Sequence, residues 1–196
     1  AKTLFPYTTL FRSTKDNPKD LKNDFIKIVE KNINDVLNTA GFDTQTLAES
    51  SFDTWLKYYR RNENSSNSQI NYYTKGAIVA MLFDFMIMDA TNGEKSLDNV
   101  MQQLYQNYSA HPDEGVTESS LCALFSSVSG IDFAPYFQKY IHTTAPLDVE
   151  FYFELLGIHL KEDYSEKNKV FLGISTQLRE GKLIITQLDK NYGAYK

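Results

Sequence analysis

The chain has 196 residues, of which 42% are hydrophobic and 23% are charged, a composition typical of a soluble globular protein with one domain or one and a half. Its net charge of -5 argues against the basic surface on which nucleic-acid binding depends, and its one cysteine, Cys122, excludes an internal disulfide. The longest apolar run, from Ala77 to Met88, is interrupted by Asp84 and is shorter than the roughly 18 residues that a membrane-spanning helix needs.

The first thirteen residues differ from the rest of the chain. Residues 3–13 read TLFPYTTLFRS, contain no acidic residue and show no helical period. This string resembles the translation of a sequencing-adapter oligonucleotide, so we expect residues 1–13 to be non-native; an ordinary β-prone segment is the alternative. The chain also stops soon after a predicted strand. We therefore expect both ends to be truncated.

Residues 14–157 have the pattern of a helical domain. Pro18 after Asn17 marks the start of a first helix, and Gly41 is expected to end it. Between them, apolar residues recur at helical spacing and are expected to face inward: Leu21, Phe25, Ile28, Val29, Ile33, Val36, Leu37 and Ala40.

Six further helices are predicted, two of them with the N-caps Ser96 and Thr117. A polar loop is predicted at residues 61–68 and a turn at Asn92-Gly93. The predicted helices cover residues 46–60 (with Trp55 near the middle), 70–88, 96–108, 117–128, 132–140 and 148–156. In the helix that Ser96 caps, the inward residues are expected to be Leu97, Val100, Met101, Leu104 and Tyr105.

The pattern changes after Gly157. A charged linker is followed by two apolar segments, at residues 171–174 and 183–186, with a glycine turn at 179–181 between them. This arrangement predicts two strands joined by a turn. The fold class is therefore mainly α, with a β-rich part at the C-terminal end.

No local motif supplies a catalytic mechanism. The three histidines, His111, His142 and His159, have no partner at metal-ligand spacing, and the chain contains no H-E-x-x-H, paired C-x-x-C, G-x-S-x-G or glycine-rich phosphate loop. Each histidine is expected in a loop, on the surface or at the end of an element. Cys122 is expected to be a buried structural residue rather than a nucleophile.

A longer run of residues carries a family resemblance. The segments AESSFDTWLKYY (48–59), NENS (62–65) and NYYTKGA (71–77) follow one another, and SLDNVM (96–101) and the helix around Asp132-Phe133 continue in the same order. This run resembles the glycyl aminopeptidase family of zinc metallopeptidases, of the gluzincin type. The resemblance implies that residues 14–160 are the C-terminal helical part of a catalytic domain. Residues 161–196 would then be a linker and the first strands of a truncated PDZ-like domain.

The resemblance implies a zinc-dependent enzyme that hydrolyses N-terminal peptide bonds. The family's zinc ligands, an H-E-x-x-H helix and a later glutamate, would precede Asn17 and are not in this chain. Zinc and the peptide substrate are therefore expected to belong to an intact parent, which family membership suggests is exported, for example to the periplasm. This chain by itself is expected to bind no zinc and to be inactive. The alternative is a non-catalytic helical interaction module with a PDZ-like peptide-binding domain.

Two candidate sites come from the same resemblance. In related gluzincin aminopeptidases a Tyr-x-Lys-Gly segment carries a tyrosine whose hydroxyl points at the reacting centre, and here that tyrosine is Tyr73. Tyr72 is the alternative candidate, and Lys75 is expected to be structural. Leu172, Gly173 and Ile174 resemble the PDZ loop that captures a peptide carboxylate, with an ordinary β-hairpin as the alternative. Because the groove's later helix is absent from the chain, we expect no peptide binding by this fragment.

Overall fold

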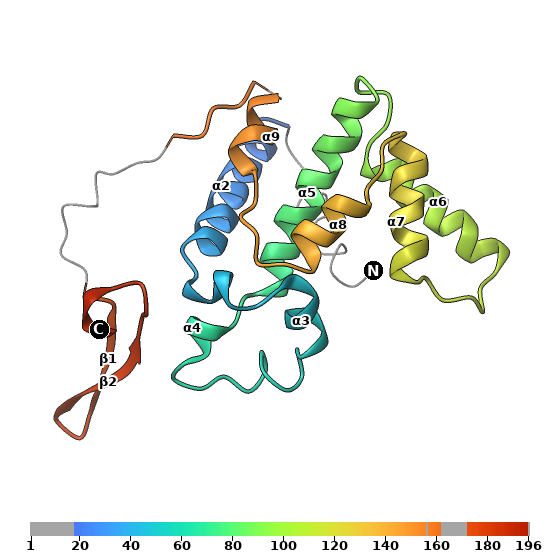
Figure 1. Ribbon diagram of the computed structural model, residues 1–196. Helices are drawn as coiled ribbons and strands as arrows, with labels where there is room; N and C mark the ends of the chain where they lie inside the picture. The colour runs from blue at the N-terminus through green and yellow to red at the C-terminus, as the bar shows by residue number, and fades with distance from the viewer. Residues whose placement is uncertain (1–17, 156, 162–171, 196) are drawn as a thin grey trace.

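The computed structural model describes residues 18–155, 157–161 and 172–195, with the side chains of the first helix described from residue 24. The adapter-like segment and nearly all of the predicted linker lie outside these residues. The described part is mainly helical and ends in a two-stranded antiparallel sheet, so the predicted fold class is confirmed (Figure 1).

The helical part contains helices α2 to α9 and one short 3-10 helix, η1. A β-hairpin and a second 3-10 helix, η2, follow. The bounds are α2 Pro18–Leu37, η1 Ala40–Asp43, α3 Leu47–Phe52, α4 Ser65–Ser68, α5 Tyr72–Ala90, α6 Leu97–Ala110, α7 Glu118–Ser129, α8 Ala134–Ile141, α9 Val149–Leu155, β1 Ile174–Arg179, β2 Lys182–Leu188 and η2 Gly193–Tyr195.

Helix α5 is the centre of the helical part. It is buried on nearly all sides because α2, α3, α6, α7 and α9 all pack against it. Phe83 on α5 is fully buried, and the rings of Phe125, Phe133 and Phe137 lie 5.3 to 5.6 Å from its ring. Asp84, which interrupts the apolar run, accepts a hydrogen bond of 2.7 Å from the backbone N–H of Leu97. The buried carboxylate thus satisfies a donor at the start of α6.

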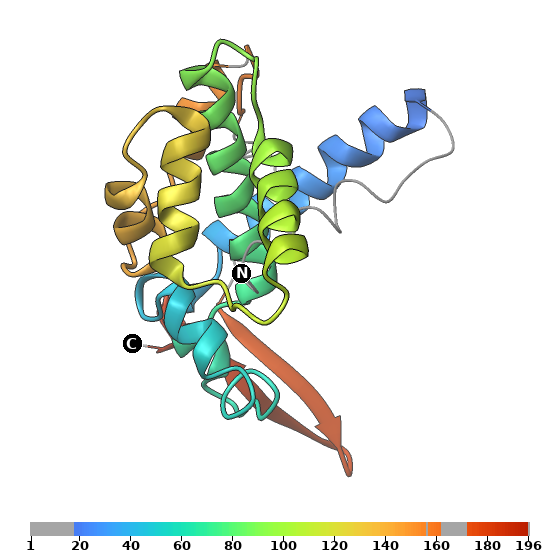
Figure 2. The same cartoon turned by 90° about the vertical axis from the view of Figure 1, so that its right-hand side faces the viewer.

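Helix α2 packs mainly through its C-terminal half, and Phe25, nearer its start, is half-buried against the same core. Val29, Ile33 and Val36 are buried, whereas Figure 2 shows the N-terminal half projecting beyond the other helices. The prediction that Leu37 faces inward was wrong, because α2 ends at Leu37 and this side chain is 51% exposed. Pro18 lies in α2 and is its first described residue, so the predicted helix start at Asn17-Pro18 stays a prediction.

Gly41 was predicted to end the first helix, but it lies inside η1. A Cβ at this position would come within 2.3 Å of the backbone O of Gln69 and 2.6 Å of its N. Glycine is therefore required by the close approach of η1 to the segment before α5, and not by a left-handed helix end.

We expect Gly41→Ala to destabilise the chain by about 1–3 kcal/mol, because the added methyl group can only be accommodated by moving backbone. Urea unfolding measures this change. Gly115→Ala is the matched control, since nothing lies within 4 Å of a Cβ there, and it should be neutral or slightly stabilising. Equal stabilities for the two variants would contradict the packing role of Gly41.

The helix predicted at residues 46–60 is much shorter than expected. Helix α3 ends at Phe52 because the hydroxyl of Thr54 donates to the backbone O of Ser50 (2.8 Å) and of Ser51 (2.9 Å), which opposes continuation of the helix. Trp55 then lies in a turn and is 76% exposed. The predicted polar loop at 61–68 contains the short helix α4.

The remaining predicted helices agree with the structure apart from their ends. Ser96 and Thr117 cap α6 and α7, and Gly130 ends α7 with φ of 79°. Tyr105 is the exception on α6, because it is 71% exposed rather than inward. None of the described helices is long and apolar enough to cross a membrane.

The hairpin has a two-residue connection and one irregularity. Glu180 and Gly181 both have positive φ (49° and 73°), as a type I′ turn requires. The register pairs Arg179 with Lys182 and Ile174 with Leu188, with a shift after Ser175. The first strand therefore begins at Ile174, at the end of the predicted segment 171–174.

Candidate active site

The N-terminus of α5 places Tyr73 at the surface. Asn71 is the N-cap: its side-chain Oδ1 accepts hydrogen bonds from the backbone N–H groups of Tyr73 (2.9 Å) and Thr74 (3.3 Å). This cap satisfies two of the donors that every helix leaves open at its start. The Tyr73 side chain is therefore held on a rigid first turn.

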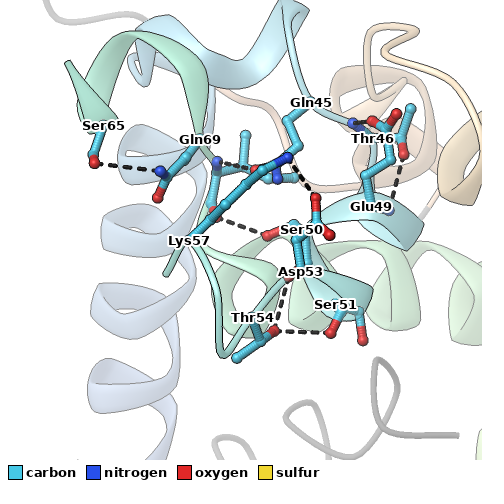
Figure 3. A network of polar contacts seen from close by, with 11 residues as sticks. Gln45, Thr46, Glu49, Ser50, Ser51, Asp53, Thr54, Lys57, Ser65 and Gln69 are labelled. Atoms are coloured by element: carbon cyan, nitrogen blue, oxygen red, sulfur yellow. Dashed lines mark hydrogen bonds and ion pairs between the residues drawn. The ribbon is translucent and has the colours of Figure 1, made fainter. Parts of the chain in front are cut away.

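A polar network ties α3 to the residues just before this cap (Figure 3). The hydroxyl of Ser50 donates to the backbone O of Ile70 (2.9 Å), and the backbone N–H of Ile70 donates to Oε1 of Gln45 (3.0 Å). Thr46 and Glu49 form a capping box at the start of α3. Because both the C=O and the N–H of Ile70 are hydrogen-bonded, the segment just before α5 is fixed relative to α3.

Four tyrosines gather where α3 and α5 meet. We call Tyr58, Tyr59, Tyr72 and Tyr73 the tyrosine cluster. The ring centroids of Tyr72 and Tyr73 are 4.1 Å apart, those of Tyr58 and Tyr72 are 5.9 Å apart, and those of Tyr58 and Tyr59 are 5.4 Å apart. Tyr72 is buried, whereas Tyr73 is 42% exposed. Tyr73 is therefore the member of the pair that can meet a substrate.

Two phenols of the cluster, those of Tyr59 and Tyr72, are held in the neutral form. A hydrogen bond with Tyr73 raises the pKa of Tyr59, and burial, together with a hydrogen bond to Tyr73, raises the pKa of Tyr72 well above its ordinary value. A neutral phenol is a hydrogen-bond donor and introduces no charge. The surface at the start of α5 thus presents O–H donors near neutral pH.

Large apolar side chains stand exposed near the cluster. Phe52 is 88% exposed, Trp55 76% and Leu56 70%. The Trp55 ring lies 5.0 Å from the ring of Tyr59, so this surface, which we call the aromatic face, is continuous with the tyrosine cluster. Clustered exposed apolar side chains mark a surface that meets another molecule or another part of the same protein.

The side chain of Lys75 lies on a different face of α5 from that of Tyr73. It is two residues after Tyr73 on α5, a spacing that places side chains on different faces of a helix. Its side chain is buried, its Nζ lies 4.3 Å from the ring centroid of Phe42, and it has no hydrogen-bond partner among the described residues. Burial lowers the pKa of Lys75 to about 8. The prediction that Lys75 has a structural role remains a prediction.

The described residues do not supply a metal site. No group of three or more His, Cys, Asp or Glu side chains within them is arranged to hold a metal ion. His142 Nε2 lies 2.5 Å from Oε1 of Glu118, and His111 Nδ1 lies 3.8 Å from Oε1 of Glu114. Cys122 is half-buried, and burial raises the pKa of its thiol, which disfavours a nucleophilic role. These residues do not fit a zinc-binding role.

The second candidate, Leu172 to Ile174, lies at the start of the hairpin. Gly173 has φ of 73°, and a Cβ there would come within 2.4 Å of the Cβ of Tyr192. The backbone O of Gly173 accepts from the N–H of Asp189 (2.8 Å), and that of Leu172 accepts from the N–H of Ala194 (3.3 Å). The loop is thus closed against the segment that follows β2. Its binding of a carboxylate stays a prediction.

Tyr73 was predicted from the sequence, whereas its hydrogen bond with Tyr59 was not. The paired tyrosines at 58–59 and at 72–73 were the available signal, since both belong to the run that carries the resemblance. The contact of Asn67 with the hairpin, described below, had no sequence signal.

The chain is similar to a known peptidase family and to one solved structure. Residues 14–79 match the M61 glycyl aminopeptidase family. The structure is similar to the crystal structure of an aminopeptidase N family protein from Idiomarina loihiensis, with a TM-score of 0.77 and 22% sequence identity. The match covers 98% of this chain and 34% of that chain, so this chain spans about a third of the solved protein. No curated protein matches significantly. The family match over residues 14–79 thus includes the run that ends in Tyr73-Thr74-Lys75-Gly76 and agrees with the resemblance to the glycyl aminopeptidase family. The similarity to the solved structure shows the fold.

Proposed function

We propose that this chain is part of a zinc-dependent aminopeptidase that hydrolyses N-terminal peptide bonds. The observation that carries the proposal is that the family match, over residues 14–79, includes Tyr73, which the structure exposes on the capped first turn of α5. The zinc ligands would come from the rest of the peptidase, and this chain by itself would be inactive.

The proposed role of Tyr73 is to donate a hydrogen bond to the oxygen on which negative charge develops during hydrolysis. Several features of the site suit this role. The phenol is attached to a rigid helix start, its ring packs on Tyr72, and its hydroxyl is hydrogen-bonded within the tyrosine cluster. A donor that is already oriented stabilises developing charge without reorganising.

The aromatic face fits the same proposal. Exposed Phe52, Trp55 and Leu56 would be covered by the rest of the peptidase domain or would line its substrate cleft beside Tyr73. In this proposal residues 14–160 are the C-terminal helical part of the catalytic domain, and residues 161–196 are a linker and the start of a PDZ-like domain. Residues 1–13 would not belong to the native protein.

The test is to recover the coding sequence upstream of residue 14 from the source DNA and to express the longer protein. We expect an in-frame H-E-x-x-H and hydrolysis of glycyl-p-nitroanilide, with a loss of activity in a metal chelator and recovery on addition of Zn²⁺, because the activated water depends on the metal. The 196-residue chain alone is the control and should show no hydrolysis. A longer protein without the motif and without activity would refute the proposal and favour the non-catalytic interaction module.

A further inference from the structure

The helical part contacts the hairpin through one buried amide. Asn67, on the four-residue helix α4, is only 6% exposed. Its Nδ2 donates to the backbone O of Leu188 (2.7 Å), and its Oδ1 accepts from the backbone N–H of Lys190 (2.9 Å). A carbonyl can only accept and an N–H can only donate, so these two bonds fix the orientation of the amide.

The pattern of these two bonds is that of β-pairing. A single residue in a neighbouring parallel strand would likewise bond, through its own N–H and C=O, to the C=O and N–H groups that flank one residue, here Asp189. Nδ2 also donates to Oδ1 of Asn64 (2.9 Å), which holds the side chain in place from within α4. Asn67 therefore recognises the backbone of the chain after β2 and not a particular side chain.

A charged contact flanks the amide. Nζ of Lys190 lies 2.5 Å from Oδ1 of Asp43 and 2.8 Å from Oγ1 of Thr44, and the hydrogen bond from Lys190 lowers the pKa of Asp43. The Asp43 side chain is 74% exposed. Because exposed ion pairs contribute little to stability, the buried amide is the stronger of the two contacts.

The segment that Asn67 binds is itself tied to the start of the hairpin. The backbone N–H of Asp189 donates to the backbone O of Gly173, and the side chain of Tyr192 packs directly against Gly173. Holding Leu188 and Lys190 therefore also holds the loop at residues 172–174. Figures 1 and 2 show the hairpin beyond the end of the helical part where α3 and α4 lie.

We propose that α4 and η1 form a docking surface for the chain's own segment 188–190, and that the Asn67 amide fixes the hairpin and the helical part as one body. Asn67 precedes Tyr73 by only six residues, so this contact sets the position of the 172–174 loop relative to the start of α5. The docking itself does not depend on the proposed peptidase function.

The first experiment measures hydrogen exchange of the Lys190 backbone amide by NMR in the 196-residue chain. In the near-isosteric variant Asn67→Asp, a carboxylate oxygen faces the Leu188 carbonyl in place of the donor. We expect the Lys190 amide to exchange at least about tenfold faster in this variant than in the unaltered chain. Asn107→Asp is the matched control, because it makes the same chemical change on exposed α6, where the Asn107 side chain bonds to Gln103, and it should leave the rate unchanged.

The second experiment measures the distance between spin labels at Lys182, the first residue of β2, and Gln103 on α6, in a Cys122→Ser background. The unaltered chain should give a narrow distance distribution and Asn67→Asp a broad one, while slow exchange of α5 amides shows that the helical part is still folded. A broad distribution in the unaltered chain, or an unchanged Lys190 exchange rate and a narrow distribution in Asn67→Asp, would overturn the proposal.

Discussion

Replacing Tyr73 by phenylalanine in the longer peptidase is expected to lower kcat by about 10²–10³ with little change in KM. The substitution removes one hydroxyl from a half-exposed ring and keeps the stacking on Tyr72, so the fold is retained. A donor that acts on charge present only in the transition state affects the chemical step and not ground-state binding. Steady-state kinetics on a glycyl substrate, with a thermal melt of each protein, measures the change.

Two neighbouring substitutions make this test specific. Tyr72→Phe alters the buried member of the pair and removes one hydrogen bond with Tyr73, so it should lower kcat by only a few-fold. Tyr59→Phe removes a hydrogen-bond partner of Tyr73 and should have an effect smaller than that of Tyr73→Phe. If Tyr73→Phe keeps more than about half of kcat in an active enzyme, the assignment of Tyr73 fails. A large loss in Tyr72→Phe alone would transfer the role to Tyr72.

The parts of the fold that were predictable from sequence are those with local causes. The caps Ser96 and Thr117 and the helix end at Gly130 act through hydrogen bonds within a few residues, so the sequence pattern reveals them. The helix over 46–60 was overestimated although its end also has a local cause: Thr54 bonds to Ser50 only four residues away, and apolar spacing does not reveal this competition. Gly41 was misassigned because the backbone that crowds it belongs to Gln69, which is distant in sequence.

In the candidate site, too, local features were predictable from sequence and tertiary contacts were not. The Tyr-x-Lys-Gly segment identified Tyr73 by resemblance, and the structure adds that Tyr73, not Tyr72, is exposed. The partnership with Tyr59 and the docking of Asn67, whose partner Leu188 is 121 residues away, arise only from tertiary packing. A pattern of spacing within one helix or strand contains no information on such contacts.

The buried ammonium of Lys75 is expected to make the stability of the chain depend on pH. The pKa of Lys75 falls from 10.5 to about 8 on folding because of burial, so between these values the unfolded chain binds the additional proton. Stability should therefore rise as the pH rises from about 8 to about 10.5, by roughly 3 kcal/mol from this group. Below pH 8 the cost of burying the charge is present in full.

Lys75→Met isolates this contribution, since methionine fills similar space without the charge. We expect the variant to be more stable than the unaltered chain at pH 7. The gain is at most about 3 kcal/mol from removing the buried charge. The lost attraction between Nζ and the Phe42 ring, about 0.5–2 kcal/mol, reduces this gain. The difference should vanish or reverse above pH 10.5.

Lys31→Met is the control: Lys31 is exposed and pairs with Asp35, so its effect should stay within about 0.5 kcal/mol at every pH. Urea unfolding of the three proteins across this range measures the differences. A Lys75→Met variant that is less stable at pH 7 would contradict a net cost of burying this charge.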